Sequence, residues 1–296
     1  MKKLFIDELL VAPQIKGINA ETHNLIDLKR CRVFLLQNIL STIPDEIDFS
    51  QLPRLAPPYE NCWFEWTKNI IKRDDIPEDF SGDIDDHMLD MMLNLDGECR
   101  QGISLSSNHI NEEGWHLYFE SYIRVGENIP LIFPILYKVE LNSDGYFIKI
   151  NKLIKGKPNP MLNSLASNLL EDDAIQESVN TVLYALGLMN CKNIVTIERG
   201  GPRGESKRNR HHAWLHRHYV LQIHPMKEIT KIEHDDGSSE REISFHFCRG
   251  HFKTYTVEKP LFGKFVGTFW WDAHARGSIK TGIVTKDYNV NPPTTI

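Results

Sequence analysis

Cationic, imidazole and aromatic side chains gather in two segments of the last third of the chain, and these residue types can do chemistry on phosphate. The first segment contains Lys207, Arg208, Arg210, His211 and Arg217. The second contains Arg249, His251, Lys253, Tyr255, Trp270, His274 and Arg276. Arginine offers a fork of donors, lysine a point charge, and histidine a cation or a proton carrier. Aromatic rings stack on unpaired bases, and of the adjacent Trp270 and Trp271 we assign that role to Trp270. The two segments predict a nucleic-acid-binding surface.

The spacing within the second segment predicts which side chains lie together. The run 241–256 has the composition of a strand, in which successive side chains point to opposite faces. Arg249, His251 and Lys253 therefore share one face, and Phe252 points to the other. Three cationic or titratable groups in a row suit a polyanion.

The same residues allow an enzymatic alternative, a metal-independent ribonuclease. Such a reaction needs a proton acceptor, a proton donor and a cation that stabilises the developing phosphorane charge. His251 and His274 could exchange the protons, and Arg249 or Arg276 could supply the cation. A structural alternative is that both histidines are partly buried residues at strand ends.

The sequence predicts neither a metal site nor a cofactor. His212 and His216 have the spacing of one helical turn, but no acidic or cysteine partner lies near them and neighbouring cations would repel a metal. The glycine-rich run 200–204 lacks the Lys-Ser/Thr pair of a phosphate-binding loop.

Charge is divided unevenly along the chain. Residues 191–296 contain 17 Lys+Arg and 11 Asp+Glu, a net charge of +6, whereas residues 1–190 contain 17 and 29, a net charge of −12. Nine of the 13 histidines follow residue 190. We interpret the basic part as the region that meets an anion, although two halves of one fold could also carry complementary charge.

The sequence predicts a cytoplasmic protein without membrane contact. Asp7 and Glu8 interrupt the first apolar run too early for an export signal. No stretch approaches the roughly 20 apolar residues of a membrane-spanning helix. The five cysteines are scattered and odd in number, so neither a disulfide framework nor a zinc ribbon is expected.

Hydrophobic periodicity predicts both helices and strands. Helical spacing of apolar residues indicates helices over 24–43, 83–95 and 173–188. Alternation or β-rich composition indicates strands over 62–66, 115–124, 132–141, 146–154 and 194–197. A hairpin is predicted between 219–233 and 241–256, with a further strand over 264–271 returning beside it.

These elements predict an α+β fold in which antiparallel β-meanders pack against helices, in one or two lobes. Gly156, Pro158 and Pro160 mark a linker. The boundary there separates an acidic N-terminal lobe, 1–157, from a basic lobe, 158–296, that contains a helix followed by a β-meander.

The order of motifs in the C-terminal part resembles a phage and mobile-element family that includes type V-A anti-CRISPR proteins. The resemblance covers roughly residues 170–277. It consists of the basic run 207–211, the β run 219–223, the Arg-Gly-His-aromatic motif at 249–252, and His-x-Arg-Gly at 274–277. The N-terminal half carries no such likeness.

The resemblance implies a protein of the host cytoplasm that lowers synthesis of its target. In that family such proteins engage the nascent N-terminal peptide of the target and cause loss of its messenger, so the implied partners are RNA or the ribosome and a host or defence protein. The ribonuclease remains one alternative, and a plain protein inhibitor of a defence complex is another.

Overall fold

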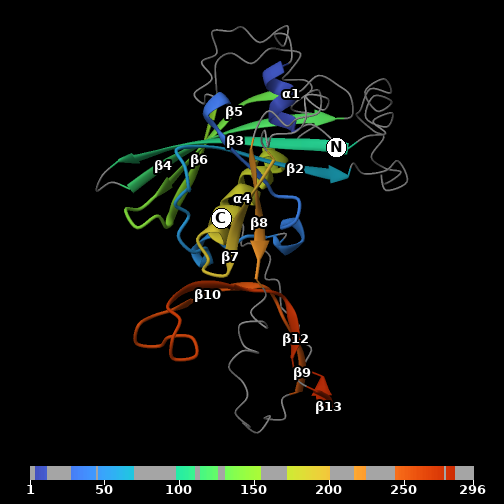
Figure 1. Cartoon of the computed structure of the whole chain (residues 1–296), viewed down its shortest axis with the longest axis vertical. Helices are drawn as coiled ribbons and strands as arrows, with labels where there is room; N and C mark the ends of the chain where they lie inside the picture. Colours follow the sequence, from blue (N-terminus) through green and yellow to red (C-terminus); the bar gives the residue numbers. More distant parts are fainter. Residues whose placement is uncertain are drawn as a thin grey trace, which may run out of the picture. The chain divides into compact units, whose positions relative to one another are not determined.

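The computed structural model describes residues 4–11, 28–44, 46–69, 98–110, 114–125, 131–154, 172–200, 217–224, 244–276 and 278–283 (Figure 1). The chain divides into two compact units, Met1–Ile223 and His224–Ile296. Each unit is described by itself below.

The first unit is built on an eight-stranded mixed sheet with the strand order β6-β5-β4-β3-β2-β1-β8-β7. Its strands are β1 (Arg32–Leu35), β2 (Asn61–Asn69), β3 (Glu98–Ile110), β4 (Gly114–Val125), β5 (Leu131–Leu141), β6 (Phe147–Ile154), β7 (Ile194–Arg199) and β8 (His218–Ile223). Strands β2 to β6 form an antiparallel meander. The short strand β1 pairs in parallel with both β2 and β8, which makes the sheet mixed.

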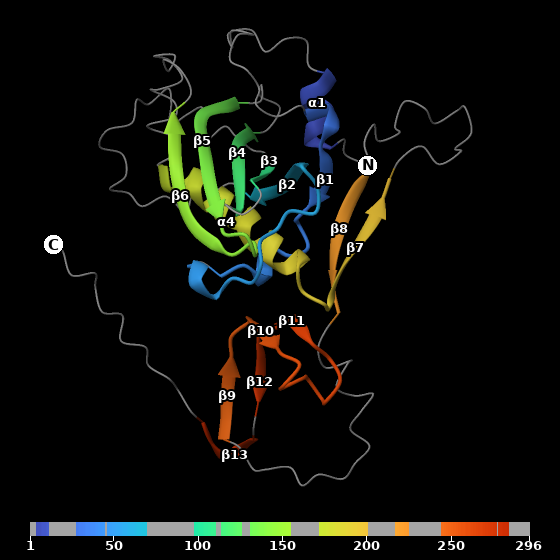
Figure 2. The same ribbon diagram turned by 90° about the vertical axis from the view of Figure 1, so that its left-hand side faces the viewer.

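Two helices cover opposite faces of this sheet. Helix α1 (Phe5–Val11) lies on the face of β2 that carries Trp63. The Phe5 and Trp63 rings pack edge-on, with their centroids 5.9 Å apart. Helix α4 (Asp172–Met189) packs against β3 and β4 on the other face, where Ser178 donates a hydrogen bond to Gln101 (Figure 2). Because both faces are covered, residues 62–66 of β2 are all buried.

The second unit contains one antiparallel hairpin in two parts. Strands β10 (His251–Tyr255) and β11 (Gly267–Trp271) pair with His251 opposite Trp271. Strands β9 (Ser244–Cys248) and β12 (His274–Arg276) pair with Cys248 opposite His274, which is the same register. Strand β13 (Ser278–Ile283) adds to β9 in parallel.

The prediction of an α+β fold is wrong, because the protein is mostly β. Among the residues that the structure describes, strand accounts for 50% and helix for 19%, and there are two α-helices. In the described part of the helix expected over 24–43, residues 28–43, the chain instead forms the short strand β1 flanked by 3-10 turns at Leu28–Arg30 and Leu40–Thr42. Val33 and Phe34 pair with strands on both sides, and this tertiary pairing overrides the helical spacing.

The predicted hairpin of 219–233 with 241–256 is also wrong. Strand β8 lies between β1 and β7 in the large sheet, whereas β9 lies between β12 and β13. The prediction rested on the turn signal Asp236-Gly237. Such a signal is local and does not show whether the flanking segments pair with each other or with more distant strands.

Other predicted elements are confirmed. The helix expected over 173–188 is α4, and the strands expected over 115–124, 132–141 and 146–154 are β4, β5 and β6. The turn at Asn142 to Tyr146 closes as expected, with the Asn142 side chain accepting a hydrogen bond from the Tyr146 amide at 2.8 Å. The predicted helix over 83–95 and the boundary at 157/158 lie outside the described residues.

Across the described ranges, no helix is both long enough and apolar enough to cross a membrane.

Candidate nucleic-acid interface

The β10–β11 hairpin has two chemically different faces. His251, Lys253 and Tyr255 alternate along one face of β10, with Trp271 and Phe269 opposite His251 and Lys253 on β11. We call these five residues the basic face. The sequence alternation predicts that His251 and Lys253 share this face, and the strand pairing places the rings of β11 beside them.

The His251 and Lys253 side chains of the basic face are exposed and held by local contacts. The Lys253 ammonium lies 5.0 Å from the centroid of the Tyr255 ring, within range of a cation–π interaction. His251 Nδ1 lies 3.0 Å from the carbonyl oxygen of Arg249. Because a carbonyl can only accept, Nδ1 donates the hydrogen in this contact. Arg249 itself is exposed just before the strand.

The basic face is anchored by a small apolar cluster. Leu261 and Phe269 are buried, and Tyr255, Phe262 and Trp271 pack against them. Tyr255 meets Phe269 edge-on with ring centroids 5.9 Å apart. The aromatic members of the basic face therefore have fixed positions between the exposed cations.

The opposite face of the hairpin is closed by Trp270. The Trp270 and Phe252 rings pack together with their centroids 4.9 Å apart. A Cβ added at Gly250 would lie 2.6 Å from the nearest carbon of the Trp270 ring. The indole Nε1 donates to Asp272 Oδ1 at 2.7 Å, and only 2% of Trp270 is exposed. The structure therefore exchanges the roles expected for the two tryptophans: Trp270 is core, and Trp271 lies on the basic face.

His274 does not join His251. His274 begins β12, which belongs to a different sheet from β10, and its Nδ1 lies 2.7 Å from the Asp272 carbonyl oxygen. His251 begins β10 in the other sheet, and no hydrogen bond or ring contact among the described residues joins the two imidazoles. Each histidine instead makes the same local contact with the carbonyl oxygen two residues before it.

The remaining predicted residues are not gathered at this face by the described structure. Arg217 is in the first unit, exposed, and paired with Glu198 at 3.1 Å. Arg276 is placed by its backbone in β12, and its side chain lies outside the described atoms. The four remaining residues of the first segment also lie outside the described residues: Lys207, Arg208, Arg210 and His211.

Sequence reasoning missed Trp271 and Phe269 as members of the basic face. Both follow from the strand register, since His251 pairs with Trp271 and Lys253 with Phe269. The sequence of 264–271 could have indicated this, because adjacent strand residues point to opposite faces. Only one of Trp270 and Trp271 can therefore lie in the core.

A second group of charges is buried in the first unit. The Glu65 carboxylate is 5% exposed and accepts hydrogen bonds from the amides of Phe5 and Ile6 and from Trp63 Nε1 at 2.8 Å. Burial raises the pKa of Glu65, while these bonds and the nearby Arg100 oppose the rise. These contacts tie the start of α1 to β2.

The network continues through a second carboxylate. Arg100 contacts Glu65 at 3.5 Å and Glu8 at 2.9 Å, and Arg124 also pairs with Glu8. Every member contacts a charge of opposite sign, so we interpret this network as scaffold. Within the described ranges, no group of three or more histidine, cysteine or carboxylate side chains has the arrangement of a metal site.

The comparisons with known proteins found no matching family model, curated protein or solved structure.

Proposed function

We propose that the protein binds single-stranded RNA through the basic face of the β10–β11 hairpin. The observation that carries the proposal is the alternation of the exposed His251 and Lys253 with the half-buried rings of Tyr255 and Trp271, which pack against the buried Phe269. Proteins that bind single strands combine cations that follow the phosphates with aromatic surfaces that stack the bases.

The resemblance of residues 170–277 to the anti-CRISPR-containing family supports a biological setting for this binding. The protein would act as an anti-defence regulator of a phage or mobile element and lower expression of a target protein. RNA or the ribosome would be held by the basic face, and the nascent target peptide by another part of the chain.

Fluorescence anisotropy with a labelled 12-nucleotide single-stranded RNA tests the proposal. The full-length protein should bind it, and more tightly than a duplex of the same sequence, because a duplex hides its bases from stacking. The double variant His251→Ala/Lys253→Ala should bind at least about tenfold more weakly, because it loses two hydrogen bonds to phosphate. Binding that is absent, or unchanged in the double variant, would refute the proposal.

Two controls separate this proposal from its alternatives. Lys149→Ala and Lys152→Ala remove exposed lysines of β6 in the first unit, and a variant carrying both should bind RNA as the wild type does. The RNA should also be recovered intact on a denaturing gel, in the presence of EDTA. Cleavage that is lost in His251→Ala would support the ribonuclease instead, and absence of both binding and cleavage would favour a plain protein inhibitor.

A further inference from the structure

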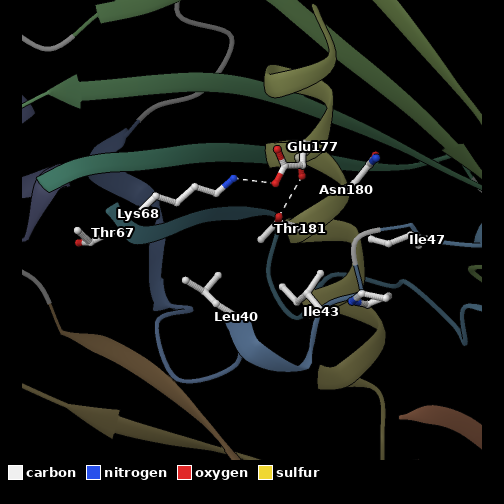
Figure 3. A pocket seen from close by; sticks show the side chains of 9 residues that line it. Leu40, Ile43, Ile47, Thr67, Lys68, Glu177, Asn180 and Thr181 are labelled. Atoms are coloured by element: carbon white, nitrogen blue, oxygen red, sulfur yellow. Dashed lines mark hydrogen bonds and ion pairs between the residues drawn. The ribbon is translucent and has the colours of Figure 1, made fainter. Parts of the chain in front are cut away.

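The first unit contains a pocket of about 420 Å³ on the α4 face of the large sheet (Figure 3). One wall is apolar and consists of Leu40, Ile43, Pro44 and Ile47, which lie in and after the 3-10 turn Leu40–Thr42. The volume lies at the small end of the range for small-molecule sites and equals about 14 water molecules at their liquid volume.

The other wall carries a pair of opposite charges. Lys68 reaches from β2 to Glu177 on α4, and its Nζ lies 2.7 Å from Glu177 Oε1 (Figure 3). The two side chains are 36% and 60% exposed. Exposed ion pairs of this kind contribute little to stability, so opening this one costs little.

Two further polar groups line the same space. The carboxamide oxygen of Asn180 is buried and accepts no hydrogen bond from the residues that the structure describes. The Thr181 hydroxyl donates to the Glu177 carbonyl oxygen at 3.0 Å and keeps its own oxygen as an acceptor. The polar wall therefore offers a ligand a cation from Lys68, a carboxylate from Glu177 and the hydroxyl oxygen of Thr181, whereas the Asn180 oxygen is covered.

We propose that this pocket binds a small zwitterion with an apolar side chain, of the class of aliphatic or aromatic α-amino acids. The ligand carboxylate would pair with Lys68 and its ammonium with Glu177. Its side chain would lie against Leu40 and Ile43. One exposed ion pair is thereby replaced by two that are shielded by the ligand's apolar part.

The charge pattern excludes simpler ligands of the same size. A fatty acid would leave Glu177 facing an apolar chain, and an alkylamine would do the same to Lys68; both leave a charge without a partner beside apolar surface. A zwitterion is the class that satisfies both charges at once. This site is separate from the basic face and does not depend on RNA binding.

Isothermal titration of the full-length protein with L-leucine and with L-phenylalanine tests the proposal. Wild type should show saturable binding of at least one of them, and glycine, which lacks the apolar group, should bind at least tenfold more weakly. Lys68→Gln and Glu177→Gln should each weaken binding at least tenfold. The matched control Lys149→Gln removes an exposed lysine that pairs with Glu140 at 3.3 Å, and it should bind as wild type.

Two analogues assign each charge to its partner. Leucinamide has no carboxylate, so its weaker binding should be insensitive to Lys68→Gln but lost in Glu177→Gln. 4-Methylpentanoate has no ammonium and should show the reverse pattern. Absence of saturable binding by both amino acids, or equal losses in Lys149→Gln, would overturn the proposal, as would analogues that respond identically to both substitutions.

Discussion

The two units use charged side chains in opposite ways. In the first unit, Glu65 and Arg100 are 5% and 8% exposed and are tied to each other, to backbone amides and to Glu8. In the second unit, His251 and Lys253 are exposed, and their contacts are with a carbonyl oxygen and a ring of their own hairpin. Charge that is buried among opposite charges stabilises a scaffold, whereas exposed charge beside aromatic surface remains available to a ligand.

The largest expected effect comes from breaking the buried network. Glu65→Leu leaves the guanidinium of Arg100 and the amides of Phe5 and Ile6 without their buried acceptor. Loss of one partner from a buried charge network costs about 3–5 kcal/mol. Urea unfolding should show this loss, while RNA affinity measured under folding conditions should be unchanged.

The control for this prediction is Glu140→Gln. Glu140 pairs with Lys138 and Lys149 in a half-buried position of β5, and the variant should leave the urea midpoint nearly unchanged. An equal loss of stability in both variants would mean that burial does not distinguish the two kinds of ion pair.

The second largest effect is expected at the centre of the hairpin. Gly250→Ala places a Cβ 2.6 Å and 2.8 Å from two carbons of the Trp270 ring, so the ring must move. Overpacking of this kind costs about 1–3 kcal/mol. Tryptophan fluorescence should change, and the second unit should unfold at lower urea concentration.

Gly263→Asn is the matched control in the same hairpin. A Cβ at Gly263 meets nothing within 4 Å, and asparagine tolerates its positive φ of 72°. The variant should keep the wild-type midpoint. If it loses as much stability as Gly250→Ala, the contact with Trp270 is not what requires glycine at position 250.

Replacing Trp271 should separate stacking from charge at the basic face. Trp271→Leu keeps an apolar side chain but removes the stacking surface, which is worth about 1–3 kcal/mol per base. RNA affinity should fall by a similar factor at low and at high salt, because stacking does not depend on counterions. A loss that disappears at high salt would contradict a stacking role.

The smallest effect concerns the pH dependence of stability in the first unit. Burial raises the pKa of Glu65 above its ordinary value of 4.5, so the part of the stability that depends on protonation of this carboxyl is fully present below that value. It is lost as the pH rises through the raised pKa. Glu65→Gln does not titrate, so the wild type's advantage in unfolding free energy over this variant should shrink as the pH rises. An advantage that grows over the same range would show that the pKa is lowered instead.

The sequence predicted local structure well and long-range pairing poorly. Helix α4 and strands β4 to β6 were predicted because their periodicity and the Asp144-Gly145 turn are local signals. Whether 28–43 forms a strand or a helix, and which strands pair with β8, depends on residues far away in the chain. A short stretch of sequence does not include those residues.

The candidate site was predicted in part for the same reason. Alternation along β10 predicts that His251 and Lys253 share a face, and they do. The choice between Trp270 and Trp271 depends on which ring covers Gly250, and the placement of His274 in a different sheet from His251 depends on strand pairing. Neither could be read from residue types alone.

The salt dependence of RNA affinity tests the central claim most directly. For single strands the logarithm of the association constant falls with the logarithm of salt concentration by about 0.7 for each phosphate contact. A variant combining Arg249→Ala, His251→Ala and Lys253→Ala should therefore bind with a slope shallower by about 1.4 to 2.1, according to whether the imidazole is charged. A slope equal to that of the wild type would contradict the assignment of the basic face to RNA.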